Sequence, residues 1–271
     1  MTDQDYDFIR KLLRDRSAIT LEDGKQYLVE SRLAPMVGEL KLGSIGDLVG
    51  LLRAPFSNGL QQRVVEAMVT TETTFFRDLH PFEALRKSLI PELVRKRQNE
   101  RSLNIWCAAC STGQEPYSVA ILLRENFPAL ASWKINILAT DLSRDVLARA
   151  REGRYSQIEV NRGLPAALLV KHFRQHGTSW QLHDHLRDMV VFQELNLVSA
   201  WPPLPRMDLV FLRNVMIYFD VEAKKVILGR MAKVLQSDGY LLLGGAETTF
   251  NLNDSYRRLN EFKTGFYQLI G

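Results

Sequence analysis

Hydrophobic positions in the first part of the chain follow a helical spacing. They recur three and four residues apart, as on one face of an amphipathic helix, and glycines and prolines interrupt them. The apolar positions are Tyr6, Phe8, Ile9, Leu12 and Leu13, then Leu28, Leu33, Leu40, Leu48, Leu51 and Leu52, and finally Val64, Val65, Met68 and Val69. The interruptions are Gly24, Pro35, Gly43, Gly46 and Pro55. We therefore predict a small all-helical domain over residues 1–75.

From about residue 91 the pattern changes to short apolar runs that alternate with helical stretches. This alternation predicts an α/β domain with a mostly parallel sheet. The predicted strands are residues 103–109, 134–140, 190–197, 207–212 and 240–244, with 261–270 as part of a terminal hairpin. The predicted helices are residues 117–126, a helix capped by Ser143 that ends at Arg151, and 221–235, capped by Asp220. A turn is predicted at Asp238–Gly239.

Residues 154–189 interrupt the alternation and are predicted to form an inserted subdomain. They contain scattered apolar residues and four of the five histidines. The complete prediction is an N-terminal domain (1–75), a linker (76–90) and an α/β domain (91–271) that carries the insert (154–189).

The composition is that of a globular protein, and it excludes few classes of function. No apolar run approaches the roughly 20 residues of a membrane span, and the acidic start of the chain lacks the pattern of a signal peptide. We therefore expect a cytoplasmic protein without membrane insertion. The net charge of +4 is too small to indicate nucleic acid binding. No self-association helix is visible, which favours a monomer.

Two groups of residues suggest metal chemistry, and both have a simpler interpretation. Cys107 and Cys110 form a C-x-x-C pair, but there is no second pair and Cys107 lies inside a predicted strand. His183 and His185 alternate in the insert, but no cysteine accompanies them. We predict no metal.

Residues 103–115 favour a nucleotide-like ligand. A buried strand leads into a turn of small residues, Cys110 to Gly113, and a helix begins at Gln114. Such a turn lets the backbone approach a ligand, and the N–H groups of the new helix attract anionic groups. Asp141 ends the next strand, where an acidic side chain accepts hydrogen bonds from ribose or merely caps a helix. Because G-x-G-x-x-G is absent, a nucleoside without a pyrophosphate fits better, and S-adenosylmethionine is such a ligand.

Two more segments carry candidate site residues. Arg213, Asn214 and Tyr218 follow the strand at 207–212, where strand ends form a crevice. The run Thr-Thr-Glu-Thr-Thr-Phe-Phe-Arg-Asp at residues 70–78 lies at the domain junction; alone, it would be read as a helix start with a solvated Arg77.

Together these motifs resemble the CheR family of chemotaxis receptor methyltransferases over essentially the whole chain. The motifs are Thr-Thr-Phe-Phe-Arg-Asp, Cys-Ser-Thr-Gly-Gln-Glu-Pro-Tyr-Ser, Ala-Thr-Asp-Leu-Ser, Asn196-Leu197 and Arg-Asn-Val-Met-Ile-Tyr-Phe, in the family's order. The resemblance implies a class I S-adenosylmethionine-dependent methyltransferase fold, a Rossmann-like mixed sheet, with an all-helical N-terminal domain and an inserted β-subdomain. It also implies methylation of glutamate side chains on the cytoplasmic helices of chemoreceptors, and recruitment to membrane receptor arrays.

The resemblance also implies roles for individual residues. Arg77 and Tyr218 would lie nearest the transferred methyl group. The cofactor-binding residues would be Thr71, Thr73, Arg77, Glu115, Asp141, Asn196, Leu197, Arg213 and Asn214. Among these, Glu115 and Asp141 would hold the methionyl and ribose parts, and the last four would line the adenosine side. Thr71 stands where many members have asparagine, and both side chains form hydrogen bonds.

The insert departs from the pattern of some members. Those members bind a C-terminal receptor pentapeptide through a glycine-rich loop in the insert, whereas the stretch around His176 is shorter here and has only Gly177. We therefore expect a pentapeptide-independent member. Arg10, Lys11 and Arg14 form either a basic surface for acidic receptor helices or an ordinary solvated face. A regulatory protein as a further partner is left open.

Two other functions compete with receptor methylation. A nucleic-acid methyltransferase on this fold would commonly carry an Asn/Asp-Pro-Pro-aromatic run after the fourth strand, but Arg213 and Asn214 are followed by Val-Met. A non-catalytic cofactor sensor would have no need of Arg77 and Tyr218.

Overall fold

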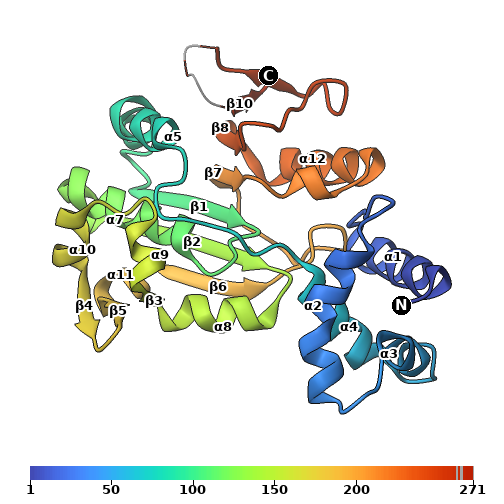
Figure 1. The fold of residues 1–271 in the computed structure, drawn as a ribbon. Helices are drawn as coiled ribbons and strands as arrows, with labels where there is room; N and C mark the ends of the chain where they lie inside the picture. Colours follow the sequence, from blue (N-terminus) through green and yellow to red (C-terminus); the bar gives the residue numbers. More distant parts are fainter. Residues whose placement is uncertain (261, 263–264, 271) are drawn as a thin grey trace. The chain divides into compact units, whose positions relative to one another are not determined.

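The computed structural model describes residues 1–260, 262 and 265–270 (Figure 1). The chain divides into two compact units. The helical unit comprises Met1–Thr70 together with Tyr218–Lys224, and the sheet unit comprises Thr71–Ile217 and Lys225–Gly271. The domain limits expected from the sequence stay predictions, and their last residue, Gly271, lies outside the described part.

The helical unit contains α1 (Asp3–Ser17), α2 (Gln26–Glu39), α3 (Ile45–Leu52) and α4 (Asn58–Met68). Most of the predicted apolar positions contribute to its core, but Leu51 is 43% exposed, and the buried Val29 is not one of the predicted positions. Among its fully or almost fully buried side chains are Ile9, Leu13, Val29, Leu33, Leu48, Val64 and Val65. The predicted interruption at Pro35 is wrong, because Pro35 lies inside α2. Burial of Leu33 and Met36 on either side of it outweighs its poor helix propensity.

A seven-stranded sheet forms the centre of the sheet unit. Its strands are β1 (Ser102–Ala108), β2 (Lys134–Asp141), β6 (Val190–Glu194), β7 (Met207–Leu212), β8 (Leu235–Leu243), β9 (Tyr256–Arg258) and β10 (Gly265–Leu269). They follow the order β6-β2-β1-β7-β8-β10-β9, in which β10 runs antiparallel to both neighbours and the pairs from β6 to β8 are parallel. Every residue of β7 is buried, as expected for a strand covered on both faces.

Helices connect and accompany these strands. They are α5 (Leu79–Ala84), the π-helix η1 (Leu85–Leu89), α6 (Ile90–Lys96), α7 (Gln114–Asn126), the 3-10 helix η2 (Pro128–Ser132), α8 (Arg144–Glu152), the 3-10 helix η3 (Met216–Tyr218) and α12 (Val221–Val234). Both predicted caps are present: the Ser143 hydroxyl accepts the N–H of Val146 at 3.5 Å, and Asp220 accepts that of Ala223 at 2.9 Å. The first turn of α12 belongs to the helical unit.

The insert has its own small antiparallel sheet. Strands β3 (Arg154–Ser156), β5 (Ser179–Leu182) and β4 (Phe173–His176) pair in that order. The accompanying helices are α9 (Gln157–Asn161), α10 (Ala166–His172) and α11 (Asp184–Arg187), and Figure 1 shows this group gathered beside α7. The inserted β-subdomain is therefore confirmed.

Two strand predictions need correction. Strand β6 ends at Glu194, three residues early, because the chain turns at Asn196. Strand β8 starts at Leu235, and the turn expected at Asp238–Gly239 is an irregularity within it. The terminal hairpin is present as β9 and β10, but Glu261, where its last strand was expected to begin, lies outside the described residues.

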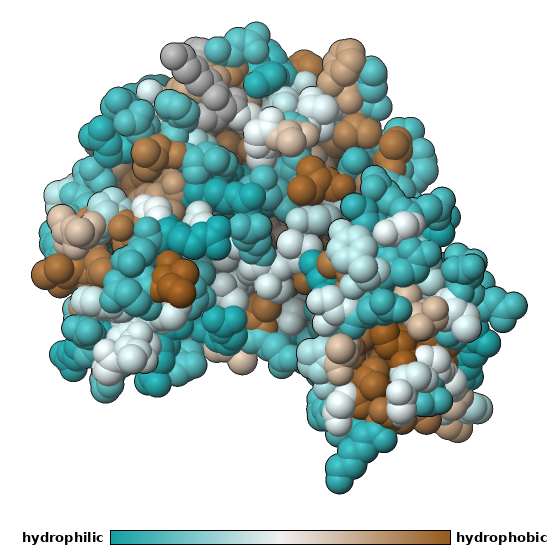
Figure 2. Space-filling view, viewed as in Figure 1, coloured by the Kyte–Doolittle hydropathy of each residue, from teal (hydrophilic) through white to brown (hydrophobic). Residues whose placement is uncertain are grey.

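Polar side chains cover most of the face shown in Figure 2, with scattered apolar groups between them. Exposed large apolar residues occur in both units; Phe56 is fully exposed and Leu79 is 65% exposed. Within the part of the chain that the structure describes, no helix has the length and apolar character needed to cross a membrane.

Candidate active site and cofactor site

The turn after β1 has an unusual backbone. Ala109 and Ser111 have φ values of 57° and 51°, and Gly113 has 91°. A Cβ atom on Gly113 would lie 3.0 Å from the Cβ atom of Ala150 and 3.3 Å from the Tyr155 hydroxyl, so only glycine fits without displacement. The turn therefore brings main chain, rather than side chains, to the carboxyl end of β1.

Asp141, at the end of β2, holds this turn in place. One carboxylate oxygen accepts the N–H of Ser111 at 2.8 Å, and the other accepts that of Ser143 at 3.0 Å. The Ser111 hydroxyl donates to the carbonyl of Thr71 at 2.7 Å. The backbone of Asp141 accepts the N–H of Leu195 at 2.9 Å. Residues predicted from distant motifs therefore meet around one turn.

A buried ion pair lies beside the start of α7. Glu115 is in the first turn of this helix, and its carboxylate accepts from the Arg213 guanidinium at 2.8 Å. The second terminal nitrogen of Arg213 donates to the Asp78 carboxylate at 2.8 Å and to the carbonyl of Arg77 at 3.0 Å. One guanidinium at the end of β7 thus connects the helix start to the Arg77–Asp78 segment.

Burial shapes the acid–base properties of these groups. It raises the pKa of Glu115, and the neighbouring Arg213 opposes that rise. Burial likewise raises the pKa values of the Cys107 and Cys110 thiols well above normal, and both cysteines are free. Buried neutral thiols are poor nucleophiles and poor metal ligands.

Asn196 and Leu197 form a turn just beyond β6. The Asn196 side chain accepts the N–H of Val198 at 3.1 Å. The carbonyl of Leu197 accepts from the indole of Trp201 at 3.1 Å and from Arg230 at 3.2 Å. The turn is therefore well fixed at the same edge of the sheet as Asp141.

Two buried polar atoms at this edge lack partners within the described residues. They are Nε of Arg213 and Oδ1 of Asn214. An unpaired buried polar atom is costly unless a ligand or water supplies a partner. A hydrogen-bonding ligand is therefore compatible with the residues present.

The two residues predicted nearest the methyl group belong to different units. Arg77 is half-buried in the sheet unit, and its guanidinium donates to the carbonyl of Glu72 at 3.3 Å. Tyr218 belongs to the helical unit, where its carbonyl accepts the N–H of Thr20 at 2.9 Å. Thr73 is half-buried in the segment that leads to Arg77. The proximity of Tyr218 to Arg77 stays a prediction.

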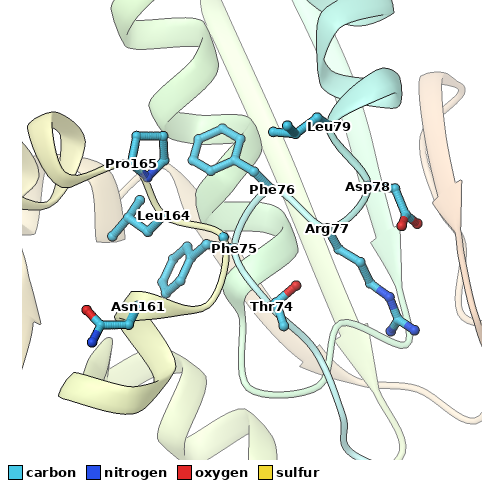
Figure 3. Close-up of a pocket in the computed structure, with 10 residues that line it drawn as sticks. Thr74, Phe75, Phe76, Arg77, Asp78, Leu79, Asn161, Leu164 and Pro165 are labelled. Atoms are coloured by element: carbon cyan, nitrogen blue, oxygen red, sulfur yellow. The ribbon is translucent and has the colours of Figure 1, made fainter.

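A cavity of about 580 Å³ lies between residues 74–79 and residues 161–165 of the insert. Figure 3 shows Phe76 and Leu79 turned toward this space, whereas the guanidinium of Arg77 points away from it. Among the predicted site residues, only Arg77 contributes to its lining. The cavity is therefore distinct from the turn around Asp141.

Sequence reasoning missed several residues that hold the site together. Asp78 pairs with Arg213, and Ser118 accepts the N–H of Phe76 at 2.9 Å. Tyr155 donates to the carbonyl of Thr112 at 2.8 Å, from the insert. Glu247 follows the end of β8 after Gly244, Gly245 and Ala246, and the strand-end argument that selects Asp141 would also have selected it.

The described residues include no group of three or more His, Cys, Asp or Glu side chains placed to hold an ion. His172 instead bonds to Glu125 at 2.9 Å. His183 and His185 stack at 5.8 Å between ring centroids.

The sheet order, the turn after β1 and the acidic end of β2 define a methyltransferase of the class I fold, with S-adenosylmethionine as its cofactor. Residues 71–264 match the CheR methyltransferase, SAM binding domain, and residues 4–69 match the CheR methyltransferase, all-alpha domain. The chain belongs to the CheR methyltransferase family.

Curated relatives align with nearly the whole chain. Chemotaxis protein methyltransferase Cher2 of Pseudomonas putida is 39% identical over 258 residues, which cover 93% of each chain. Chemotaxis protein methyltransferase 1 of Pseudomonas aeruginosa is 40% identical over the same length, with the same coverage. Chemotaxis protein methyltransferase of Vibrio parahaemolyticus is 38% identical over 260 residues, 94% of this chain and 93% of its own.

Proposed function

We propose that this chain transfers a methyl group from S-adenosylmethionine to glutamate side chains on the cytoplasmic helices of chemoreceptors, for adaptation in chemotaxis. The observation that carries the proposal is the alignment with chemotaxis protein methyltransferases over 93% of both chains. On this proposal the protein acts in the cytoplasm at membrane receptor arrays, as a monomer. Docking of a regulatory protein is compatible with the same proposal.

The cofactor assignment follows the chemistry of the donor set. Glu115 offers a carboxyl group to the methionyl ammonium group, and Asp141 offers one to the ribose hydroxyls. Thr71, Thr73, Asn196, Leu197 and Asn214 complete the binding residues. The contacts of Arg213 support a place beside Glu115, where its charge opposes the rise in the pKa of that carboxyl group that burial causes.

The reaction needs alignment more than proton transfer. S-adenosylmethionine supplies an electrophilic methyl group on a positively charged sulfur. A free glutamate side chain has a pKa of ~4.3, so the nucleophile is already ionised at neutral pH and no strong general base is required. Since an anion and a cation neutralise one another, a site that excludes water favours the reaction. The protein's part is to hold the carboxylate in line at contact distance.

We assign this alignment to Arg77, which orients the substrate carboxylate, and to Tyr218, which shapes the methyl-transfer position. Arg77→Ala and Tyr218→Phe should each lower turnover, with Arg77→Ala reducing it on the order of 100-fold. Arg162→Ala is a matched control, because Arg162 pairs with Glu72 of the same segment at 2.7 Å. Near-full turnover in both variants, with unchanged cofactor binding, would show that the roles are wrong.

The activity itself is tested with radiolabelled S-adenosylmethionine and purified receptor signalling fragments, with RNA as a parallel acceptor. Glutamyl methyl esters are base-labile, so the label on the receptor should be released as volatile methanol in alkali. Base-stable label, or label on the RNA alone, would contradict the proposal.

We propose that the helical unit recognises the receptor, with the basic side chains of α1 on the binding surface. Arg10 also pairs with Asp23 at 2.7 Å, and Arg14 lies 3.6 Å from Asp220. Charge reversal at Arg10 and Arg14 should therefore weaken receptor methylation, with thermal unfolding measured to separate recognition from stability. Unaltered methylation would argue against this surface.

The geometry of the insert supports pentapeptide independence. Strands β4 and β5 are joined by only two residues, Gly177 and Thr178, because His176 pairs directly with Ser179. A two-residue turn offers no extended loop for a peptide. Calorimetry with C-terminal receptor pentapeptides should detect no binding, and micromolar affinity would overturn the proposal.

A further inference from the structure

A buried carboxylate lies where the ends of β7 and β8 meet. Glu247 is 9% exposed. One of its oxygens accepts the N–H groups of Val215 at 2.9 Å and Met216 at 2.7 Å, and the other accepts those of Asn214 at 2.8 Å and Gly244 at 2.7 Å. Hydrogen bonds to an ionised acceptor are the strong ones, so these four bonds fix the local backbone.

Three of the donors are consecutive in sequence. Successive backbone N–H groups that converge on one point form a concave anion site, often with a left-handed residue. Asn214 supplies that conformation, with φ of 57°. The anion that fills this concavity is a side chain of the protein itself, delivered from the end of β8, which pairs with β7 (Figure 1).

The conformation of Asn214 has consequences for its side chain. A non-glycine residue in the left-handed region is uncommon and persists where its surroundings impose it. Here the bonds from Glu247 impose it. The Oδ1 atom of Asn214 is buried without a partner within the described residues, and the preceding Arg213 holds Glu115. The carboxylate therefore determines how two predicted cofactor residues are presented.

We propose that Glu247 is a positioning residue for cofactor binding. It holds the backbone of residues 214–216 so that the side chain of Asn214 is directed at S-adenosylmethionine. This inference rests on the proposed cofactor role of Asn214. In a purely structural role, Glu247 would only tie β7 to β8. A double-mutant cycle on cofactor affinity would then show no coupling between Glu247 and Asn214, whereas a positioning role predicts coupling.

The first test uses Glu247→Gln. The substituted amide has the same shape, but its NH2 group would face backbone N–H groups. It cannot accept hydrogen bonds from them. Affinity for S-adenosylhomocysteine, measured by calorimetry, should fall about tenfold or more. Asn214→Ala should also weaken binding, and the double variant should bind about as well as Asn214→Ala alone. Additive losses, or an unchanged affinity in Glu247→Gln, would overturn the proposal.

A second pair of variants retains Glu247 in the sequence, so its result does not depend on whether Glu247→Gln folds. A Cβ atom on Gly244 would lie 2.7 Å from the Glu247 carboxylate, 2.8 Å from the side-chain nitrogen of Asn214 and 2.9 Å from its backbone nitrogen. One on Gly245 would meet nothing within 4 Å. Gly244→Ala should therefore weaken S-adenosylhomocysteine binding severalfold, while Gly245→Ala should match the unmodified protein. Equal affinities for the two variants would overturn the proposal. Failure of the unmodified protein to bind would instead refute the cofactor assignment.

Discussion

A single hydroxyl group connects the insert to the cofactor turn. Tyr155 is 1% exposed, donates to the carbonyl of Thr112 at 2.8 Å, and its hydroxyl lies 3.3 Å from where a Cβ atom on Gly113 would be. Its ring also meets that of Phe75 edge-on, at 5.0 Å between centroids. Tyr155 therefore contacts both the turn and the segment that leads to Arg77.

Tyr155→Phe should reduce affinity for S-adenosylhomocysteine, because the hydrogen bond from the Tyr155 hydroxyl would no longer restrain the Thr112 carbonyl and the turn. Removal of a buried hydrogen bond costs about 1 kcal/mol, so we expect a loss of roughly fivefold. Tyr117→Phe is the matched control: its hydroxyl donates to the carbonyl of Ala150 in α8 at 2.6 Å, and not to a carbonyl of the turn. Calorimetry should separate the two variants, although both lower thermal stability. Equal affinities would show that Tyr155 does not restrain the turn.

A buried histidine makes stability depend on pH. Burial lowers the pKa of His172 below its ordinary 6.5, although its bond to Glu125 opposes the shift and nearby Lys171 and His185 reinforce it. Its Nδ1 atom is buried and has no acceptor within the described residues, so a proton there would be unpaired.

The direction of the pH effect follows from proton binding. The unfolded chain binds this proton more readily than the folded one. The contribution of the neutral His172 to the free energy of unfolding is therefore fully present above pH 6.5 and is lost as the pH falls below it. Urea unfolding at several pH values should show the decline, and His172→Gln should reduce it. His176→Gln, on an exposed histidine of the same insert, should leave the slope unchanged. An identical slope in His172→Gln would contradict the assignment.

At the scale of elements, the insert is fitted closely against the segment before Arg77. Gly163 has φ of 87°, and a Cβ atom there would lie 2.0 Å from the carbonyl oxygen of Phe75. Main chain packs on main chain at this point, so no side chain can be accommodated without movement of one element.

Gly163→Ala should therefore destabilise the protein by about 2 kcal/mol more than Gly177→Ala. Gly177 shares the left-handed backbone, with φ of 58°, but a Cβ atom added to it would meet nothing within 4 Å. Both substitutions place a side chain in the left-handed region, so the difference between the two losses of stability reports the steric clash at Gly163. Denaturant unfolding measures both variants, and equal losses would show that the contact is easily relieved.

The elements differ in how well sequence predicts them. The strand at 207–212 is predicted correctly because a continuous apolar run needs no partner to be recognised. The start of β8 is missed because Asp238 and Gly239 have the composition of a turn. Their place in a strand depends on β7 and on Arg97, which bonds to Asp238 at 2.5 Å. Such distant partners leave no local pattern.

The candidate site is predictable in part for a similar reason. Strand ends identify Asp141, Arg213 and Asn214, since parallel strands place their carboxyl ends at one edge. The pairing of Glu115 with Arg213 is not predictable, because those residues are far apart in sequence and each has other suitable partners. The family resemblance supplies identities, and the structure supplies the contacts between them.

At the scale of the whole molecule, the helical unit is discontinuous in sequence, because Tyr218–Lys224 belongs to it along with the first 70 residues. Ile19 forms an antiparallel bridge with Phe219, and the N–H of Thr20 reaches the carbonyl of Tyr218 at 2.9 Å. A short segment that contains a candidate catalytic residue is thus built into the unit proposed to recognise the receptor.

This arrangement limits how receptor preference can be exchanged by recombination between relatives. A chimaera that imports residues 1–70 alone pairs a foreign Ile19–Thr20 segment with the resident 218–224 segment, whereas one that also imports 218–224 keeps matched partners. We expect the second chimaera to retain clearly higher turnover on the donor's receptor, at equal S-adenosylhomocysteine affinity. Equal turnover of the two would mean that the segments vary independently. If the second chimaera is the more active, a crossover near residue 70 must be accompanied by exchange of the segment some 150 residues downstream. Receptor preference is then transferred only when both segments are exchanged together.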